Sequence, residues 1–279
     1  MKRGLVTTNI LRRSRTWALA FGVLITANLA QAQQKPFQPE VGQPGKDVVW
    51  VPTPAEMVEK MLDLAQVTPQ DFVMDLGSGD GRNIIAAARR GAQALGVEYN
   101  PDMVELSKRA AAEAGVAGKA QFVQGDMYKA DISKADVLAL FLLPSNLLEL
   151  RSKFLELRPG SRIVSNTFYI QDWTPDQTVQ VDDCSSWCTA LLYIVPGRVA
   201  GTWRLPQGEL TLTQDFQMVS GTLTAGGGLT SVTGRLRGDQ ITLTAGTQEY
   251  SGVVRGNAIE GTVRAGSGTT PWKAERTAN

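Results

Sequence analysis

A carboxylate followed by three alternating glycines forms the motif with the clearest chemical meaning. The segment Val73–Arg82 reads VMDLGSGDGR and is expected to pass from an apolar strand through a glycine turn into a helix. Such a turn lets a nucleotide-like ligand approach the backbone, and the helix N-terminus offers unpaired amides to an anionic group. A tight turn without any ligand is the alternative. A dinucleotide fingerprint would have glycine or alanine where the chain has arginine at position 82, so the spacing favours a different nucleotide-like ligand. The candidate binding residues are Asp75, Gly77, Ser78 and Gly79.

Two further strand ends carry side chains suited to the same ligand. Glu98 lies 21 residues after Gly77 (98 minus 77), where a carboxylate can accept both hydroxyls of a ribose. Asp126 and Met127 follow the next expected strand and provide a carboxylate for an adenine amino group and an apolar side chain for the face of its ring. Taken singly, Glu98 could be a solvated strand-end acid, and Gly125-Asp126-Met127 could be an ordinary turn. Their order on consecutive strands favours one common site.

The composition excludes several classes of chemistry. The 279 residues contain no histidine, which excludes Ser-His-Asp and Cys-His nucleophile systems and histidine-ligated metals, and no metal site is expected. The net charge is 28 minus 27, or +1. The first 32 residues hold five basic and no acidic residues, so the remainder carries 23 minus 27, or −4. A nucleic-acid partner is therefore not expected.

The elements that position these residues alternate between short apolar runs and helical stretches, which predicts an α/β fold with a doubly wound, Rossmann-like, mostly parallel sheet. The helix after Asn100 is expected to use that residue as its N-cap and Pro101 as its first residue, with Glu105 and Arg109 as an i,i+4 pair, and to run to Gly115. Five strands are expected at Phe72–Leu76, Ala94–Glu98, Ala120–Val123, Val137–Leu142 and Arg162–Asn166. Other helices are expected from Pro54, at Asn83–Arg90 and at Ser145–Leu157.

The whole pattern resembles the class I, seven-strand S-adenosylmethionine-dependent methyltransferases over residues 50–196. Within that superfamily it looks most like the small mitochondrial lysine methyltransferases of the ATP synthase c subunit and the adenine nucleotide translocase, and their bacterial relatives. The segments that carry this resemblance, in order, are Trp50–Pro54, Met57–Leu62, Asp75–Arg82, Gly96–Pro101, Gly125–Lys129, Phe141–Pro144, Arg162–Ser165 and Trp173–Pro175. The resemblance implies an S-adenosylmethionine cofactor and a protein lysine or small amine as the methyl acceptor.

The resemblance also implies roles for residues outside the glycine turn. Pro144, Ser145 and Asn146 are expected beside the transferred methyl group, or else Pro144 and Ser145 simply begin the next helix. Thr53 is expected to cover the methionine end of the cofactor, or to act as an ordinary N-cap. Tyr128 and Trp173 could line an acceptor channel, although single aromatic residues more often belong to the core.

The two ends of the chain differ from the mitochondrial pattern. Residues 1–32 combine a basic start, an apolar run and Ala30-Gln31-Ala32, which predicts an export signal cut after Ala32 and a periplasmic protein. An uncut leader anchored in the inner membrane is the alternative, and would be the only membrane contact expected. Arg12-Arg13 supports a twin-arginine route only weakly. Residues 33–46 are interpreted as a linker, and residues 47–197 as the methyltransferase domain.

The last part of the chain is rich in glycine and threonine, and residues 198–276 are expected to form a small antiparallel β meander or barrel. A repeat relates Thr233–Ile241 to Ser251–Ile259, with Gly238-Asp239 and Gly256-Asn257 at hairpin turns that require positive φ. Cys184 and Cys188 could form a local disulfide in an oxidising compartment or remain two free thiols.

Two functional hypotheses follow, an active methyltransferase acting on an amine and an exported scaffold that retains the fold without turnover. The retained Asp75, Gly77, Gly79, Glu98 and Asp126 favour the enzyme. A third and weaker interpretation is that the leader remains as a poorly cut anchor and that the methyl acceptor is a membrane or small-molecule amine.

Overall fold

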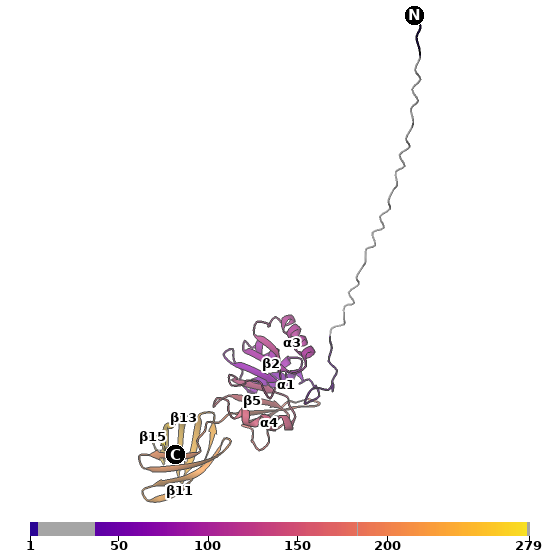
Figure 1. The fold of residues 1–279 in the computed structure, drawn as a ribbon. Helices are drawn as coiled ribbons and strands as arrows, with labels where there is room; N and C mark the ends of the chain where they lie inside the picture. Colours follow the sequence, from indigo (N-terminus) through magenta and orange to yellow (C-terminus); the bar gives the residue numbers. More distant parts are fainter. Residues whose placement is uncertain (5–36, 183, 278–279) are drawn as a thin grey trace. The chain divides into compact units, whose positions relative to one another are not determined.

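The computed structural model describes residues 1–4, 37–182 and 184–277. The expected export signal therefore lies almost entirely outside the described residues. Phe37–Asn279 forms one compact unit, shown in Figure 1. Within the described residues, no helix has both the length and the apolar character needed to cross a membrane.

A seven-stranded sheet forms the first half of this unit. Its strand order is β3-β2-β1-β4-β5-β7-β6, with β1 to β5 parallel and β7 antiparallel to both β5 and β6. The strands are β1 (Phe72–Leu76), β2 (Gln93–Glu98), β3 (Ala120–Gln124), β4 (Val137–Leu140), β5 (Arg162–Asn166), β6 (Gln177–Gln180) and β7 (Thr189–Ile194). The five predicted strands are present, β4 is two residues shorter than predicted, and the structure adds β6 and β7.

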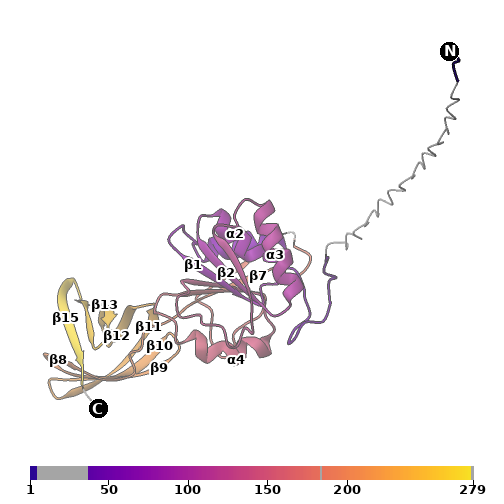
Figure 2. The ribbon, with the colours of Figure 1, turned by 45° about the horizontal axis from the view of Figure 1, so that its top comes forward.

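Helices cover both faces of the sheet, as expected for a doubly wound fold. They are α1 (Ala55–Leu64), α2 (Arg82–Arg89), α3 (Pro101–Glu113) and α4 (Pro144–Phe154). Figure 2 shows α4 on the opposite side of the sheet from α2 and α3. Successive strand residues therefore enter different cores, so that Val73 packs with α1 and α2 whereas Met74 packs with α4.

Helix α3 begins as its sequence predicts. Asn100 Oδ1 accepts a hydrogen bond from the Asp102 amide, Pro101 is the first helical residue, and Gly115 follows the helix with a φ of +70°. Glu105 was expected to pair with Arg109. In the structure its carboxylate pairs instead with Lys108, the residue before Arg109, whose Nζ lies 2.8 Å away on the same helix face.

Strands β8 to β15 form a closed antiparallel barrel, as expected for the glycine- and threonine-rich region. Pairing between β15 and β8 closes it. The strands are β8 (Gly201–Leu205), β9 (Gly208–Asp215), β10 (Met218–Ala225), β11 (Gly228–Arg237), β12 (Gln240–Ala245), β13 (Gln248–Arg255), β14 (Ala258–Ala265) and β15 (Gly268–Arg276). Closure leaves no exposed sheet edge in this described domain, and alternate residues fill the interior.

The internal repeat corresponds to two equivalent hairpins of the barrel. Gly238 and Gly256 begin the two turns with φ of +62° and +60°, as predicted, and the matching isoleucines Ile241 and Ile259 are both buried in the barrel core. Gly234 has no side chain because a Cβ there would lie 2.1 Å from a backbone oxygen of the neighbouring strand. The glycine of the repeat is therefore required because the neighbouring strand packs too closely for a side chain.

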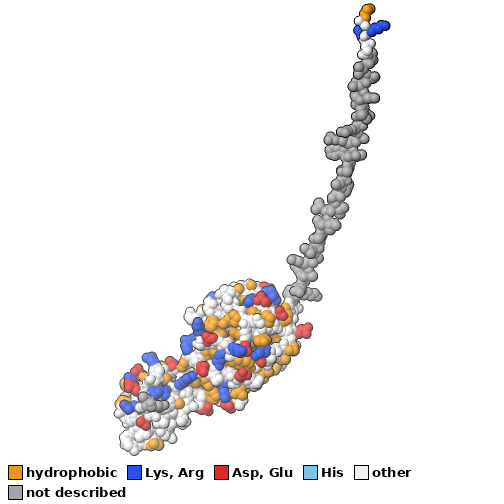
Figure 3. Space-filling view, viewed as in Figure 1, with side chains coloured by type: hydrophobic (Ala, Val, Ile, Leu, Met, Phe, Trp, Pro, Cys, Tyr) orange, Lys and Arg blue, Asp and Glu red, His pale blue; other side chains and the backbone are white. Residues whose placement is uncertain are grey.

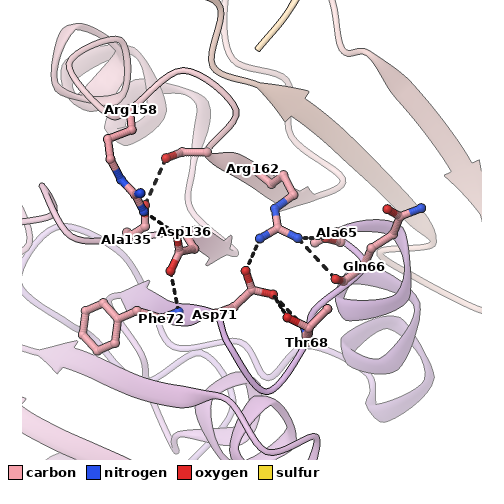
Figure 4. Close-up of polar contacts among 10 residues, drawn as sticks. Ala65, Gln66, Thr68, Asp71, Phe72, Ala135, Asp136, Arg158 and Arg162 are labelled. Carbon is pink, nitrogen blue, oxygen red and sulfur yellow. Dashed lines mark hydrogen bonds and ion pairs between the residues drawn. The ribbon is translucent and has the colours of Figure 1, made fainter. Parts of the chain in front are cut away.

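A partly buried guanidinium holds β5 to the loop before β1, at the end of the sheet shown in Figure 4. Arg162 forms an ion pair with Asp71 and donates to the carbonyls of Ala65, at 2.7 Å, and Gln66, at 3.2 Å. The Asp71 carboxylate also accepts from the Thr68 amide at 2.7 Å. This network joins segments that are distant in sequence.

Replacing Arg162 with alanine is expected to lower the free energy of unfolding by about 2–4 kcal/mol, because it leaves a largely buried carboxylate without its charged partner. The matched control is Arg158→Ala. Arg158 pairs with Asp136 but its side chain is 64% exposed, so its loss should cost less than about 1 kcal/mol. Urea unfolding of both variants measures the difference, and equal losses would contradict this account of the network.

Candidate functional site

The glycine turn between β1 and α2 has a backbone conformation that other residues rarely adopt. Gly77, Gly79 and Gly81 have φ of +72°, +55° and +81°. A Cβ on Gly79 would lie 2.8 Å from Trp50 Nε1, and one on Gly81 would lie 2.6 Å from the Phe122 ring. The glycines therefore permit both the turn and the close packing around it.

The amides of Gly77, Ser78 and Gly79 in this turn are already bonded within the protein. Gly77 and Ser78 donate to the Val97 carbonyl at 2.8 and 3.1 Å. Gly79 donates to Glu98 Oε2 at 2.9 Å. The anion bound at this turn is therefore the protein's own Glu98 side chain, whose other oxygen accepts from the Asn100 amide at 2.9 Å.

Asp75 is buried at the end of β1, beneath the turn. Its carboxylate accepts a hydrogen bond from Asn83 Nδ2 at 3.0 Å. Burial raises the pKa of Asp75 well above its ordinary value, and the hydrogen bond from Asn83 opposes that rise. A positively charged ligand beside Asp75 would favour its ionised form.

Two adjoining pockets meet at the carboxyl edge of the sheet, where ligands bind in open α/β folds. The larger one has walls from Glu98, Asn100, Met103 and Met127, and the smaller one from Thr53, Asp75 and Asn83. The residues shared by both are Trp50, Val51, Gly77 and Phe141. The residues expected from the sequence to bind a ligand that border one or both pockets are Thr53, Asp75, Gly77, Ser78, Gly79, Glu98 and Met127.

Ser78 and Thr53 take positions that their sequence context did not reveal. Ser78 Oγ lies 2.6 Å from the place where a Cβ on Gly96 would be, so its side chain packs against β2. Thr53 does not cap the first helix, whose N-cap is Pro54 without a side-chain cap. Instead, the Thr53 carbonyl accepts from Arg82 Nη1 at 2.6 Å, which joins the segment before α1 to the glycine turn.

An N-terminal strap, residues 42–51, contributes to the larger pocket. It is held by hydrogen bonds from the Gly42 amide to the Trp50 carbonyl at 2.8 Å and from the Trp50 amide to the Gln43 carbonyl at 3.0 Å. Residues 43–51 line the pocket. Residues 43–46, which the sequence suggested to be part of a linker, therefore lie against the pocket, because prolines in a short sequence favour both a linker and a turn.

Asp126 lies beside the larger pocket, but its carboxylate contacts Lys46 and the Tyr128 amide. Its Oδ2 lies 3.2 Å from Lys46 Nζ of the strap, and its Oδ1 accepts from the Tyr128 amide at 3.0 Å. The Tyr128 hydrogen bond, followed by Lys46, holds the pKa of Asp126 below its ordinary value. Lys46 Nζ also lies 5.5 Å from the ring centroids of Tyr99 and Tyr128. A role for Asp126 in binding a base stays a prediction.

The residues expected beside the transferred methyl group begin α4, and Phe141 from the same loop reaches the pockets. Pro144 is the first residue of α4 and Ser145 is exposed. Asn146 is buried, accepts from the Leu143 amide at 3.2 Å and donates to Tyr128 Oη at 2.7 Å. These contacts give Asn146 a structural role in holding the start of α4. A catalytic role for Pro144, Ser145 and Asn146 stays a prediction.

Trp173 belongs to the core, which was the alternative to an acceptor channel. Its ring is buried and lies 5.3 Å from the ring centroids of Tyr193 and Phe216. Phe216 is in the turn between β9 and β10, so Trp173 packs the sheet against the barrel.

The pockets have the donors and acceptors that S-adenosylmethionine requires. Asn83 Oδ1 is buried in the smaller pocket without a hydrogen-bond partner among the described residues, so it can accept from the ammonium group of a methionine moiety. Asp75 supplies a carboxylate nearby, and Glu98 borders the larger pocket, where its carboxylate can accept from ribose hydroxyls. Met103 and Met127 offer apolar contacts to a base. The side chains present therefore fit this cofactor.

Strand order, glycine turn and carboxylate positions together define a seven-strand S-adenosylmethionine-dependent methyltransferase. A crystal structure described as an RNA methyltransferase from Salinibacter ruber in complex with S-adenosyl-L-homocysteine is similar, with a TM-score of 0.51 and 44% identity. The similarity covers 53% of this chain and 96% of that chain.

Sequence comparisons identify the family within this class. The ANTKMT methyltransferase domain matches residues 75–177. A protein-lysine N-methyltransferase of Saccharolobus islandicus (strain REY15A) is 40% identical over 152 residues, which are 53% of this chain and 94% of that protein. The chain belongs to the family of protein-lysine N-methyltransferases that includes this archaeal protein. The lysine N-methyltransferase of the ATP synthase c subunit from Mus musculus is 37% identical over 130 residues, which are 46% of this chain and 52% of that protein.

Proposed function

We propose that this methyltransferase transfers the methyl group of S-adenosylmethionine to the side-chain amine of a protein lysine. The observation that carries the proposal is the 40% identity to a protein-lysine N-methyltransferase across 94% of that protein's length. Residues 75–177, which match the ANTKMT methyltransferase domain, contain the glycine turn and the carboxylates of the site. The comparisons do not favour a scaffold that has lost its activity.

The RNA methyltransferase from Salinibacter ruber suggests RNA as a second acceptor. Charge argues against it. Residues 33–279 carry 23 basic and 27 acidic side chains, whereas RNA-binding surfaces are strongly basic. On the face shown in Figure 3, blue and red side chains are interspersed. A protein acceptor therefore agrees better with the surface.

Methyl transfer from a sulfonium requires alignment of donor and acceptor and exclusion of water. When bound, the cofactor would supply a methyl group on a sulfonium, which an amine lone pair can accept while the electron pair of the carbon–sulfur bond stays on sulfur. Asp75, Asn83 and Glu98 would hold the cofactor, and Trp50 and Phe141 provide apolar walls.

Lysine must enter this site as the neutral amine. Its ordinary pKa is about 10.4, so the ammonium has to lose a proton before it can attack. Apolar walls disfavour the charged form and promote that loss to solvent. A histidine base is not needed for this step.

Transfer of a tritium-labelled methyl group distinguishes the two acceptors. Whole-cell extract is incubated with the full chain and labelled S-adenosylmethionine, and then divided between protease and ribonuclease treatment. The proposal expects label that protease releases and that acid hydrolysis recovers as methyl-lysine. Label released by ribonuclease would instead establish an RNA acceptor and overturn the proposal.

We also propose that the chain is exported and works in the periplasm. The basic and apolar leader and the small residues around Ala32 support export. The disulfide between Cys184 and Cys188 is compatible with an oxidising compartment. N-terminal sequencing of the protein from fractionated cells tests this, since an intact Met1 in the cytoplasmic fraction would contradict it.

A further inference from the structure

A disulfide loop places a tryptophan against two aromatic side chains. Cys184 and Cys188 are bonded, with their Cα atoms 5.6 Å apart, and Trp187 lies in the small loop between them. The Trp187 ring centroid lies 5.4 Å from that of Phe141 and 5.6 Å from that of Phe168. The Phe141 and Phe168 centroids are 6.1 Å apart. We call these three side chains the aromatic cluster.

The aromatic cluster borders the cofactor site. Phe141 follows the last residue of β4 and lines both pockets, and Phe168 follows β5 by two residues. Both therefore lie at the carboxyl edge of the sheet. The loop with Trp187 connects β6 and β7. Three separate connections thus converge beside the cofactor pockets.

The conformation of Trp187 is costly for a side chain of its size. Its φ is +63°, in the left-handed region that bulky residues rarely adopt. Thr167, beside Phe168, has the same φ of +63°. Such backbone strain persists only where surrounding structure enforces it, and it is concentrated at functional sites. For Trp187 the enforcing structure is the disulfide loop.

Packing alone gives no reason for this arrangement. The Trp187 side chain remains 37% exposed, so it buries less apolar surface than a core tryptophan. Two neighbours in sequence are also exposed: Leu143, two residues after Phe141, is 37% exposed, and Tyr169, directly after Phe168, is 54% exposed. The cluster therefore presents apolar and aromatic surface to solvent beside the cofactor pockets, as a binding surface does.

We propose that the aromatic cluster receives the acceptor lysine and that the disulfide positions Trp187 for this purpose. This inference rests on the proposed lysine methylation. Aromatic faces attract an ammonium group and pack against the methylene chain of lysine. The same surface also removes water from the amine, and this desolvation opposes the attraction and favours the neutral form that reacts. Trp187 is thus an acceptor-binding residue, and Cys184 and Cys188 are positioning residues.

The test measures acceptor and cofactor binding separately in the full chain. The acceptor probe is a degenerate peptide library with one central lysine, and its counterpart has arginine there. Trp187→Ala is expected to raise the KM for the lysine library about tenfold, while the Kd for S-adenosylmethionine, measured by calorimetry, changes less than about twofold. Trp187→Phe should recover most of the loss, because it restores an aromatic face.

Two further variants separate positioning from general damage. Cys184→Ser/Cys188→Ser keeps Trp187 but releases its loop, and should raise the same KM. Leu229→Ala removes an apolar side chain that is 72% exposed on the barrel, and should leave KM unchanged.

The outcomes distinguish this inference from the proposed function. An unchanged KM in Trp187→Ala, with wild-type transfer to lysine intact, would overturn the role of the cluster alone. A tenfold higher Kd for S-adenosylmethionine in the same variant would also overturn it, because Trp187 would then support the cofactor site. If the wild type transfers no methyl to either library while binding S-adenosylmethionine, the proposed function itself fails and the inference falls with it.

Discussion

Replacing Glu98 with alanine is expected to weaken S-adenosylmethionine binding at least about a hundredfold, because hydrogen bonds to a charged group contribute about 1.5–3 kcal/mol each. Glu98 has two tasks. Its carboxylate accepts from the amides of Gly79 and Asn100, which holds the glycine turn, and it borders the pocket where ribose hydroxyls would bind. Alanine removes both tasks together.

Calorimetric titration with S-adenosylmethionine measures the effect, and circular dichroism monitors the fold. Glu105→Ala is the matched control, since Glu105 lies on exposed α3 surface and pairs only with Lys108 among the ion pairs of the described residues. Its Kd should equal that of the wild type. Wild-type binding by a folded Glu98→Ala protein would refute the site assignment.

Replacing Asp75 with asparagine is expected to abolish most cofactor binding while leaving stability at neutral pH equal or higher. Burial raises the pKa of Asp75 above its ordinary value, so the folded protein binds a proton more tightly than the unfolded chain. The free energy of unfolding therefore falls as the pH rises from the ordinary pKa to the raised one. Asparagine is neutral at every pH, so the variant should lose this part of the pH dependence.

The cofactor is positively charged and favours the ionised carboxylate, so binding should release a proton from Asp75 when the pH is below its raised pKa. That release appears in calorimetry, over a pH series that starts just above the ordinary pKa of an aspartate, as a binding enthalpy that depends on the ionisation enthalpy of the buffer. The wild type should show this dependence. A wild-type enthalpy that is the same in all buffers, together with normal binding by Asp75→Asn, would contradict the role of Asp75. Urea unfolding from pH 4 to 8 supplies the stability measurement.

The local elements and the cofactor of this protein were predictable from the sequence. Asn100 and Pro101 specify a helix start through interactions within one turn. The three glycines are identified because positive φ at alternate residues excludes nearly every other residue type. Glu98 and Met127 follow from their position at the ends of strands, which a parallel sheet brings to one edge.

The partners of those residues were not predictable, because they depend on side chains brought together from distant segments. Nothing near Lys46 in sequence shows that it would meet Asp126, or that residues 43–51 would fold over the pocket. Ser78 Oγ packs on Gly96 of the neighbouring strand, a contact fixed by strand register. Phe141 reaches the pocket because β4 ends two residues earlier than its apolar run.

The sequence alone determined the parts of this protein that depend on short-range physics: backbone conformation at glycine, helix capping, alternation of strand residues and the absence of histidine chemistry. The tertiary structure alone decided which long-range contacts complete the site, including closure of the barrel by β15 and β8 and the convergence of Phe141, Phe168 and Trp187. The reason is that a single residue's conformational preference is expressed locally, whereas such contacts form only when whole elements pack.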